Sequence, residues 1–377
     1  MVYNDFNGIK LSALGMGTMR LPVVNGNDAV IDEETSLRMF DYAYEHGVNY
    51  FDTAWGYHAG NSELVTGKAL KRYPRDSFYL ATKFPGYDVS NFPKAEEIFE
   101  KQLEKCQVDH FDFYLLHNVC EANIEYYLDP KYGIYDYFTE QKKNGRIRHL
   151  GFSAHAIYDN IVRFLEVYGD DMEFGQLQLN WLDWSFQDGE RKYNLLKERN
   201  IPVVVMEPLR GGKLCNLKPE YEAKLKAVHP DWNQVEWAFR FLQRLSAVSV
   251  TLSGMSDEKQ MMENIDIYEK HEPLSDADMK VLDEIVEDMK KEKSLPCTSC
   301  HYCTSHCPAE LDIPYLISLY NEAIMTGKGG FIAPMALGVL DDSKKPGACL
   351  HCESCEAVCP QQIKISDMMI EFAKMTS

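Results

Sequence analysis

Basic side chains are scarce in this chain relative to acidic ones. Lys and Arg together number 39 against 58 Asp and Glu, which gives a formal net charge of -19 at pH 7. This negative charge repels phosphate backbones and anionic membrane surfaces, and no long cluster of Lys and Arg reverses it locally. The composition therefore argues against nucleic acid as a partner.

Long hydrophobic runs are also lacking. No segment approaches the roughly 20 consecutive apolar residues that a membrane-spanning helix requires. The N-terminal sequence MVYND lacks the basic stretch and apolar core of an export signal. We therefore expect a cytoplasmic protein with no membrane partner.

Cysteine, in contrast, is abundant, with 11 residues in the chain. Without an export signal, this number favours metal binding or redox chemistry over a disulfide scaffold. Eight of them form two runs with the spacing C-x-x-C-x-x-C-x-x-x-C-P. The first run is Cys297, Cys300, Cys303 and Cys307, and the second is Cys349, Cys352, Cys355 and Cys359.

This spacing predicts two 4Fe-4S clusters. The two-residue gaps let three thiolates of one tight loop bind one cluster, while the fourth cysteine reaches the other cluster. We therefore expect crossed ligation, in which Cys359 completes the cluster of the first run and Cys307 that of the second. Structural zinc is the alternative, but zinc usually draws its four ligands as two separated pairs. The runs resemble those of bacterial ferredoxins in their spacing.

The rest of the chain predicts an α/β fold, a (β/α)8 TIM barrel. Short apolar runs alternate with amphipathic stretches between residues 11 and 268, as in parallel strands joined by crossover helices. Eight such pairs close a barrel. The predicted strands are 14–18, 49–53, 78–83, 112–117, 147–153, 174–180, 202–207 and 248–253. We assign residues 1–293, with a linking helix over 276–293, to the barrel and 294–377 to a ferredoxin-like iron-sulfur domain.

Three ionisable residues, Asp52, Lys83 and His117, fall at the carboxyl ends of predicted strands, where barrel enzymes place catalysis. Tyr57 follows on the loop after Asp52. A tyrosine with a pKa near ~10 is a weak acid unless a nearby cation favours its phenolate, and Lys83 can be that cation. Asp52 would orient the ammonium, and His117 would donate a hydrogen bond to a substrate oxygen.

In this order and spacing the four residues resemble the catalytic tetrad of the aldo-keto reductase superfamily. The segments GMGTMRLP, NYFDTA and SELVTGKAL match its early motifs, and the resemblance covers roughly residues 8 to 290. It implies NADH or NADPH as the cofactor, a small aldehyde or ketone as the substrate, and Tyr57 as the general acid or base. The cysteine runs also resemble a subgroup of this family that carries a two-cluster tail.

The same resemblance implies a set of cofactor-binding residues. Ser153 and Gln178 align with residues that bind the nicotinamide carboxamide, although Ala154 stands where the family has Asn. Met206 takes the place of an aromatic residue that often stacks on the ring. The adenosine half aligns with Gly254, Ser256, Gln260, Glu263 and Asn264. Because positions 254 and 260 are not basic, the choice between NADH and NADPH stays open.

Three hypotheses follow for the whole chain. In the first, the protein is an oxidoreductase that moves a hydride between NAD(P)H and a small carbonyl compound. In the second, the clusters exchange single electrons with an electron-transfer protein, which requires an additional carrier such as a flavin because a hydride carries two electrons. In the third, the clusters are a structural staple or a redox sensor.

Overall fold

The computed structural model describes residues 1–297, 300–301, 303–327 and 330–376. The chain divides into two compact units, Met1–Met279 and Lys280–Ser377. This division falls within helix α12 (Asp276–Lys293), whereas the predicted boundary lies at the end of that helix, and the domain limits stay a prediction. Across the described ranges, no helix combines the length and apolarity needed to cross a membrane.

The first unit contains a closed barrel of eight parallel strands, which confirms the predicted fold class. The strands follow one another around the barrel in chain order, and β10 pairs with β3 to close it. They are β3 (Leu14–Gly17), β4 (Tyr50–Asp52), β5 (Tyr79–Phe84), β6 (Phe111–Val119), β7 (Ile147–Ala154), β8 (Phe174–Gln178), β9 (Val203–Met206) and β10 (Val248–Ser253).

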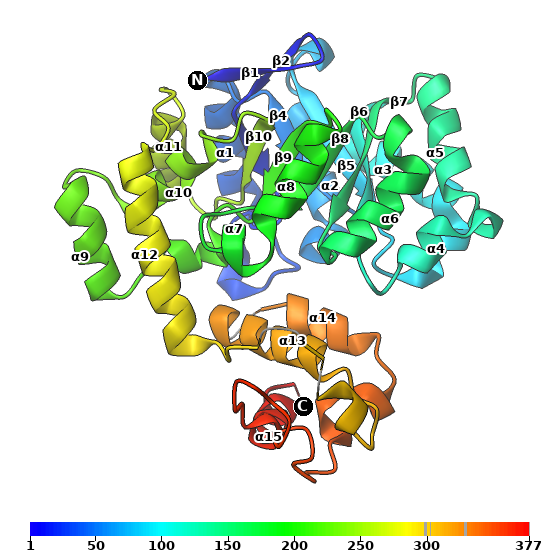
Figure 1. The fold of residues 1–377 in the computed structure, drawn as a ribbon. Coiled ribbons are helices and arrows are strands. Elements are labelled where there is room, and N and C mark those ends of the chain that lie inside the picture. Colours follow the sequence, from blue (N-terminus) through cyan, green and yellow to red (C-terminus); the bar gives the residue numbers. More distant parts are fainter. Residues whose placement is uncertain (298–299, 302, 328–329, 377) are drawn as a thin grey trace. The chain divides into compact units, whose positions relative to one another are not determined.

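Helices connect these strands and surround them in Figure 1. Their starts carry ordinary capping residues: Asp32 caps α1, and Asn233 and Glu236 form a capping box on α10. The helices of this unit are α1 (Glu33–Glu45), α2 (Ser62–Leu70), α3 (Ala95–Cys106), α4 (Ile124–Leu128), α5 (Ile134–Lys143), α6 (Tyr158–Tyr168), α7 (Asp183–Phe186), α8 (Gly189–Glu198), α9 (Pro219–Val228), α10 (Gln234–Leu242) and α11 (Glu258–Ile267).

A hairpin that the sequence analysis did not predict, β1 (Tyr3–Phe6) and β2 (Ile9–Ser12), precedes the barrel. Its Phe6 ring packs edge-on against Phe113 and Phe174, with ring centroids 5.1 and 6.2 Å away. Both partners lie near the first residues of their strands, so the hairpin fills the amino-terminal end of the barrel. The carboxyl ends of the strands are therefore left to form the site.

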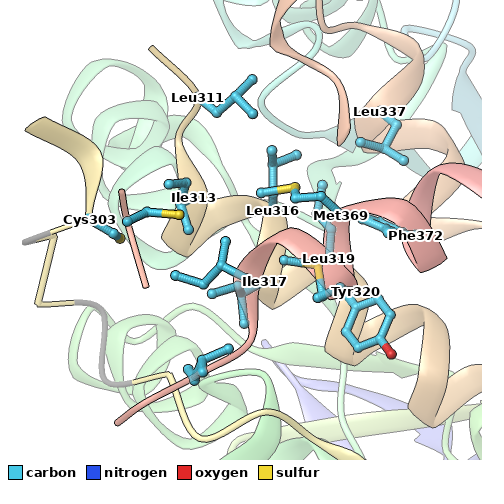
Figure 2. Packing of buried hydrophobic residues seen from close by; sticks show 14 of the residues in the cluster. Cys303, Leu311, Ile313, Leu316, Ile317, Leu319, Tyr320, Leu337, Met369 and Phe372 are labelled. Carbon is cyan, nitrogen blue, oxygen red and sulfur yellow. The ribbon is translucent and has the colours of Figure 1, made fainter. Parts of the chain in front are cut away.

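The second unit packs three helices, α13 (Ile313–Thr326), α14 (Ile332–Gly338) and α15 (Ile365–Met375), around an apolar core of its own. Figure 2 shows Leu316, Met369 and Phe372 converging within this core. Cys303 and Cys355 are themselves buried members of it. The cysteine loops are thus part of the packing of this unit.

Candidate active site and cluster-binding domain

Three ionisable side chains project into the barrel at the carboxyl ends of neighbouring strands. Asp52 ends β4, Lys83 is the last but one residue of β5, and His117 lies near the end of β6. The residues two positions before them, Tyr50, Ala81 and Leu115, belong to the core inside the barrel. Because side chains two residues apart on a strand point to the same face, Asp52, Lys83 and His117 also point toward the inside of the barrel.

The Lys83 ammonium lies at the centre of the site. Its Nζ donates to Oδ1 of Asp52 at 2.6 Å and to the carbonyl oxygen of Thr53 at 2.7 Å. The side chains of Lys83 and Asp52 are only 1% and 4% exposed. Tyr57 begins the short turn η2 (Tyr57–Gly60), and its ring centroid lies 5.1 Å from Nζ of Lys83. The structure therefore brings these predicted residues together.

Burial and charge act in opposite directions on the Tyr57 hydroxyl. Burial raises the pKa of Tyr57, while the ammonium of Lys83 lowers it, and burial has the larger effect. For Lys83 the net effect is a raised pKa. Burial alone would lower it, but the interactions with Asp52 and Tyr57 together outweigh burial. At neutral pH the tyrosine therefore keeps its proton and the lysine its charge. The spacing of residues indicates the influence of the cation, but the stronger influence of burial becomes visible only in the folded structure.

His117 borders the same site. Its ring lies edge-on to Tyr57 and to Tyr87, with centroid distances of 6.2 and 5.4 Å. Burial, supported by the charge of Lys83, holds the pKa of His117 well below its usual range, so the imidazole is neutral. Its Nδ1 is buried and has no hydrogen-bond partner among the described residues. A neutral imidazole has one N–H to donate, which agrees with the role predicted for it.

The predicted nicotinamide-binding residues lie at the carboxyl ends of three successive strands. Oγ of Ser153, on β7, accepts a hydrogen bond of 2.8 Å from the backbone N–H of Asn118. Gln178 ends β8 and lies in register with Met206, which ends β9. The amide oxygen of Gln178 is buried and interacts with the imidazole of His155, and its second lone pair can accept from another donor. This oxygen is suited to accept from an amide group of a ligand.

A buried ionic network that the sequence analysis did not identify holds Gln178. Asp183 accepts hydrogen bonds from the amide nitrogens of Gln178 and Asn180, at 2.8 and 2.7 Å, and from Nε of Arg210 at 2.9 Å. An ionised carboxylate can only accept, so Gln178 must turn its nitrogen toward Asp183 and its oxygen away. The residues were visible in LNWLDW and EPLRGG, but neither segment reveals that they meet.

The predicted adenosine-binding residues follow β10 and lie partly on α11. Oε1 of Gln260 accepts from the backbone N–H of Ser256 at 3.0 Å, which folds the loop onto the helix. Asn264 is buried and donates to Oγ of Ser253 at 3.0 Å. Glu263 pairs with Lys259 at 3.6 Å. These internal contacts shape the loop, and the binding roles of the residues stay predictions.

Gly254 lies beneath the side chain of Arg20, from the loop after β3. A Cβ added at Gly254 would lie 3.3 Å from three side-chain carbons of Arg20. The guanidinium lies 3.7 Å from Glu207, and the Arg20 side chain is 45% exposed. A cation is thus present beside Gly254, one of the two positions at which the sequence has no basic residue. No local pattern links position 20 to position 254.

Two cavities of the second unit each combine three cysteines of one run with the last cysteine of the other. One is lined by Cys297, Cys300, Cys303 and Cys359. The other is lined by Cys307, Cys349, Cys352 and Cys355. Each cavity is therefore lined by the four cysteines that the spacing predicts as ligands of one cluster, and their ligand roles stay a prediction. No three His, Cys, Asp or Glu side chains within the described ranges are grouped to hold one metal ion. A cluster spreads its thiolates further apart, because each binds a different iron.

Comparison with known families gives two matches. Residues 13–287 match the Aldo/keto reductase family, and residues 296–363 match the 4Fe-4S dicluster domain, which implies two clusters. The NADH-specific methylglyoxal reductase of Escherichia coli (strain K12) is 26% identical over 332 residues, which cover 75% of this chain and 97% of that protein. Probable aldo-keto reductase 1 of Glycine max is 29% identical over 216 residues, covering 54% of this chain and 58% of that protein.

A solved structure agrees with these matches. The holo form of an aldo-keto reductase from Bacillus halodurans superposes with a TM-score of 0.60 at 26% identity, covering 76% of this chain and 96% of that one. Members of this family act on carbonyl compounds, and membership in it implies NAD(P)H as the cofactor. The chain therefore belongs to the aldo/keto reductase family and carries a C-terminal 4Fe-4S dicluster domain.

Proposed function

We propose that this protein transfers a hydride between NADH or NADPH and a small aldehyde or ketone, with Tyr57 as the general acid for reduction and the general base for oxidation. The observation that carries the proposal is the buried pair of Lys83 and Asp52, 2.6 Å apart, beside the Tyr57 ring. A buried ammonium next to a phenol stabilises the phenolate that remains once the proton has been donated.

The bound nicotinamide supplies the hydride for carbonyl reduction. The Tyr57 hydroxyl donates its proton to the carbonyl oxygen as negative charge develops there, and Lys83 stabilises the resulting phenolate. Asp52 holds the ammonium in place through its 2.6 Å hydrogen bond. His117, which is neutral, donates a hydrogen bond to the same oxygen. One hydride and one proton then convert the carbonyl group to an alcohol.

The cofactor assignments rest on how the surrounding residues are held. Asp183 fixes the Gln178 amide so that its oxygen can accept from the nicotinamide carboxamide, and Ser153 lies on the neighbouring strand. Met206 would contact the nicotinamide ring, at the position where the family often has an aromatic side chain. The residues that would hold the adenosine half are Gly254, Ser256, Gln260, Glu263 and Asn264. Because one relative is named an NADH-specific methylglyoxal reductase, NADH and methylglyoxal are the first pair to test.

For the tail, we propose that the eight cysteines hold the two 4Fe-4S clusters in the crossed arrangement. Cys303 and Cys355 are 7% and 8% exposed and belong to the apolar core of their unit. This burial favours a second role, in which the clusters stabilise the fold of the tail. A role in one-electron transfer would require a flavin or a comparable carrier between the hydride and the clusters.

The experiment uses protein purified without oxygen and analysed for iron, sulfide and flavin. NADH or NADPH labelled with deuterium at the transferable position of the nicotinamide is then supplied with methylglyoxal and a panel of small aldehydes. Direct hydride transfer predicts deuterium on the carbinol carbon of the product, in protein without flavin. Loss of the label to solvent, or a requirement for flavin, would contradict the proposal and favour the one-electron hypothesis. Unchanged turnover after oxidative loss of the clusters would show that hydride transfer does not need them and would count against the one-electron hypothesis.

A further inference from the structure

The turn that carries Tyr57 has an unusual backbone. His58 and Ala59, which follow the tyrosine, have φ angles of 52° and 53°. Glycine adopts this left-handed region readily, whereas the Cβ of other residues crowds the following carbonyl group there. Two consecutive non-glycine residues in this conformation persist only where the surrounding structure holds them. The contacts of this turn should therefore include one strong enough to fix it.

The His58 imidazole makes such a contact. Its side chain is 1% exposed, and both ring nitrogens bond to the backbone of the loop between β3 and α1. Nε2 accepts from the backbone N–H of Leu21 at 3.1 Å, and Nδ1 lies 2.8 Å from the carbonyl oxygen of Asp28, to which it donates. The bond at Nε2 requires a ring that carries its proton on Nδ1. One imidazole thus ties two points of that loop to the residue next to Tyr57, and its Nδ1 also lies 3.2 Å from Oδ1 of Asp28.

Other contacts attach the following helix to the same loop. Nδ2 of Asn61 donates to the carbonyl oxygen of Ala29 at 2.9 Å, and the hydroxyls of Ser62 and Thr18 lie 2.7 Å apart. These bonds do not depend on His58, so its replacement should loosen the Tyr57 turn without detaching the loop. Of these contacts, those of His58 are the nearest in sequence to the catalytic hydroxyl. His58 is therefore suited to set the position of that hydroxyl.

We propose that His58 is a positioning residue, which fixes the Tyr57 turn against the loop that carries Arg20 and Leu21 and so keeps the Tyr57 hydroxyl aligned with Lys83. The inference rests on the proposed function, because it concerns the acid assigned there. A displacement of about 1 Å in a catalytic group can cost on the order of 10²-fold in rate. The side chain of His58 need not touch the substrate to have that effect.

The test compares two substitutions at position 58. His58→Gly removes the imidazole with all its contacts and tolerates the left-handed backbone, so its effect does not come from backbone strain. His58→Asn tolerates this backbone as well and keeps an amide that can reach one backbone partner. We expect kcat to fall by about 10²-fold in His58→Gly and by less in His58→Asn. The affinity for NAD(P)H, measured by fluorescence titration, should stay the same in both.

The matched control is His46→Ala. His46 is exposed and bonds through Nδ1 to the carbonyl oxygen of Tyr42 in the last turn of α1, so its loss should leave kcat unchanged. A folded His58→Gly protein with the kcat of the wild type would overturn the inference. If His58→Gly does not fold, wild-type kcat in His58→Asn would overturn it as well. A parallel loss of cofactor affinity and thermal stability would indicate a merely structural role and would also count against it.

A Tyr57→Phe variant separates this inference from the proposed function. If Tyr57→Phe keeps wild-type turnover, the assignment of the acid is wrong, and the inference about His58 fails with it. If Tyr57→Phe loses turnover while folded His58 variants keep it, only the positioning role is wrong. Loss of turnover in Tyr57→Phe and His58→Gly, with a partial loss in His58→Asn, supports both.

Discussion

Replacing Lys83 with Met should destabilise the barrel and abolish most of its activity. The substitution leaves the Asp52 carboxylate, 4% exposed, without its cation, and Oδ2 of Asp52 already lacks a hydrogen-bond partner among the described residues. Removing one partner of a buried ion pair costs about 3 to 5 kcal/mol. The loss of a preorganised charge beside a developing oxyanion costs kcat on the order of 10²- to 10³-fold.

The destabilisation should depend on pH in a defined direction. Burial raises the pKa of Asp52, and Lys83 opposes this effect, so in Lys83→Met only the upward influence remains. A carboxyl group whose pKa is higher in the folded state than the unfolded value of about 3.9 holds its proton more tightly when folded. The wild type shares this titration because its Asp52 pKa is also raised, so the stability deficit of Lys83→Met should widen between the folded-state pKa of the wild type and the higher one of the variant.

Tryptophan fluorescence is a suitable signal for urea unfolding without oxygen. All five tryptophans, Trp55, Trp181, Trp184, Trp232 and Trp237, lie in the barrel unit, so the signal does not report on the tail. The matched control is Lys83→Met combined with Asp52→Leu, which removes both charges and should recover stability but not activity. If Lys83→Met unfolds at the wild-type urea midpoint at pH 7, the reasoning about the buried pair is refuted.

Three further predictions concern the clusters, His117 and the helix packing. Cys359→Ser should alter the electron paramagnetic resonance signal of the same cluster as Cys300→Ser, because crossed ligation assigns both residues to that cluster. If Cys359→Ser instead alters the same signal as Cys352→Ser, crossed ligation is ruled out. Because the pKa of His117 is held well below its usual range, kcat/KM should show no titration of this residue between about pH 5 and 8. If kcat/KM of the wild type changes with pH in that range and this change is absent in His117→Gln, the imidazole is not neutral throughout it. Gly67→Ala should cost about 1 to 3 kcal/mol, because its Cβ would lie 2.6 Å from the backbone carbonyl group of Cys106. The urea midpoint of barrel unfolding measures this loss of stability. An unchanged midpoint would show that α2, which carries Gly67, and α3, which carries Cys106, can move apart.

The barrel, and the meeting of Asp52, Tyr57, Lys83 and His117 at the carboxyl ends of its strands, could be predicted because both depend on local patterns. Eight apolar runs at regular spacing predict the strands, and the carboxyl end of a strand is visible in the sequence. The hairpin β1–β2 also left a signal, since Asn7 and Gly8, with φ angles of 49° and 89°, form an Asn-Gly turn typical of hairpins. The sequence analysis did not use that signal.

The contacts between loops could not be predicted in the same way. Asp183 meets Arg210, and Arg20 covers Gly254, across segments that lie far apart in the chain. The state of Tyr57 likewise depends on how deeply the fold buries it, which no spacing reveals. His58 was visible beside Tyr57, but its role depends on a backbone conformation and on two hydrogen bonds to a distant loop.

The turnover of Tyr57→Phe tests the central claim most directly. Protein purified without oxygen is supplied with NADH or NADPH and a small aldehyde that the wild type reduces. Loss of the general acid should lower kcat by about 10²- to 10⁴-fold, while NAD(P)H binds as tightly as before. A folded Tyr57→Phe protein that reduces the aldehyde at the wild-type rate would contradict the account.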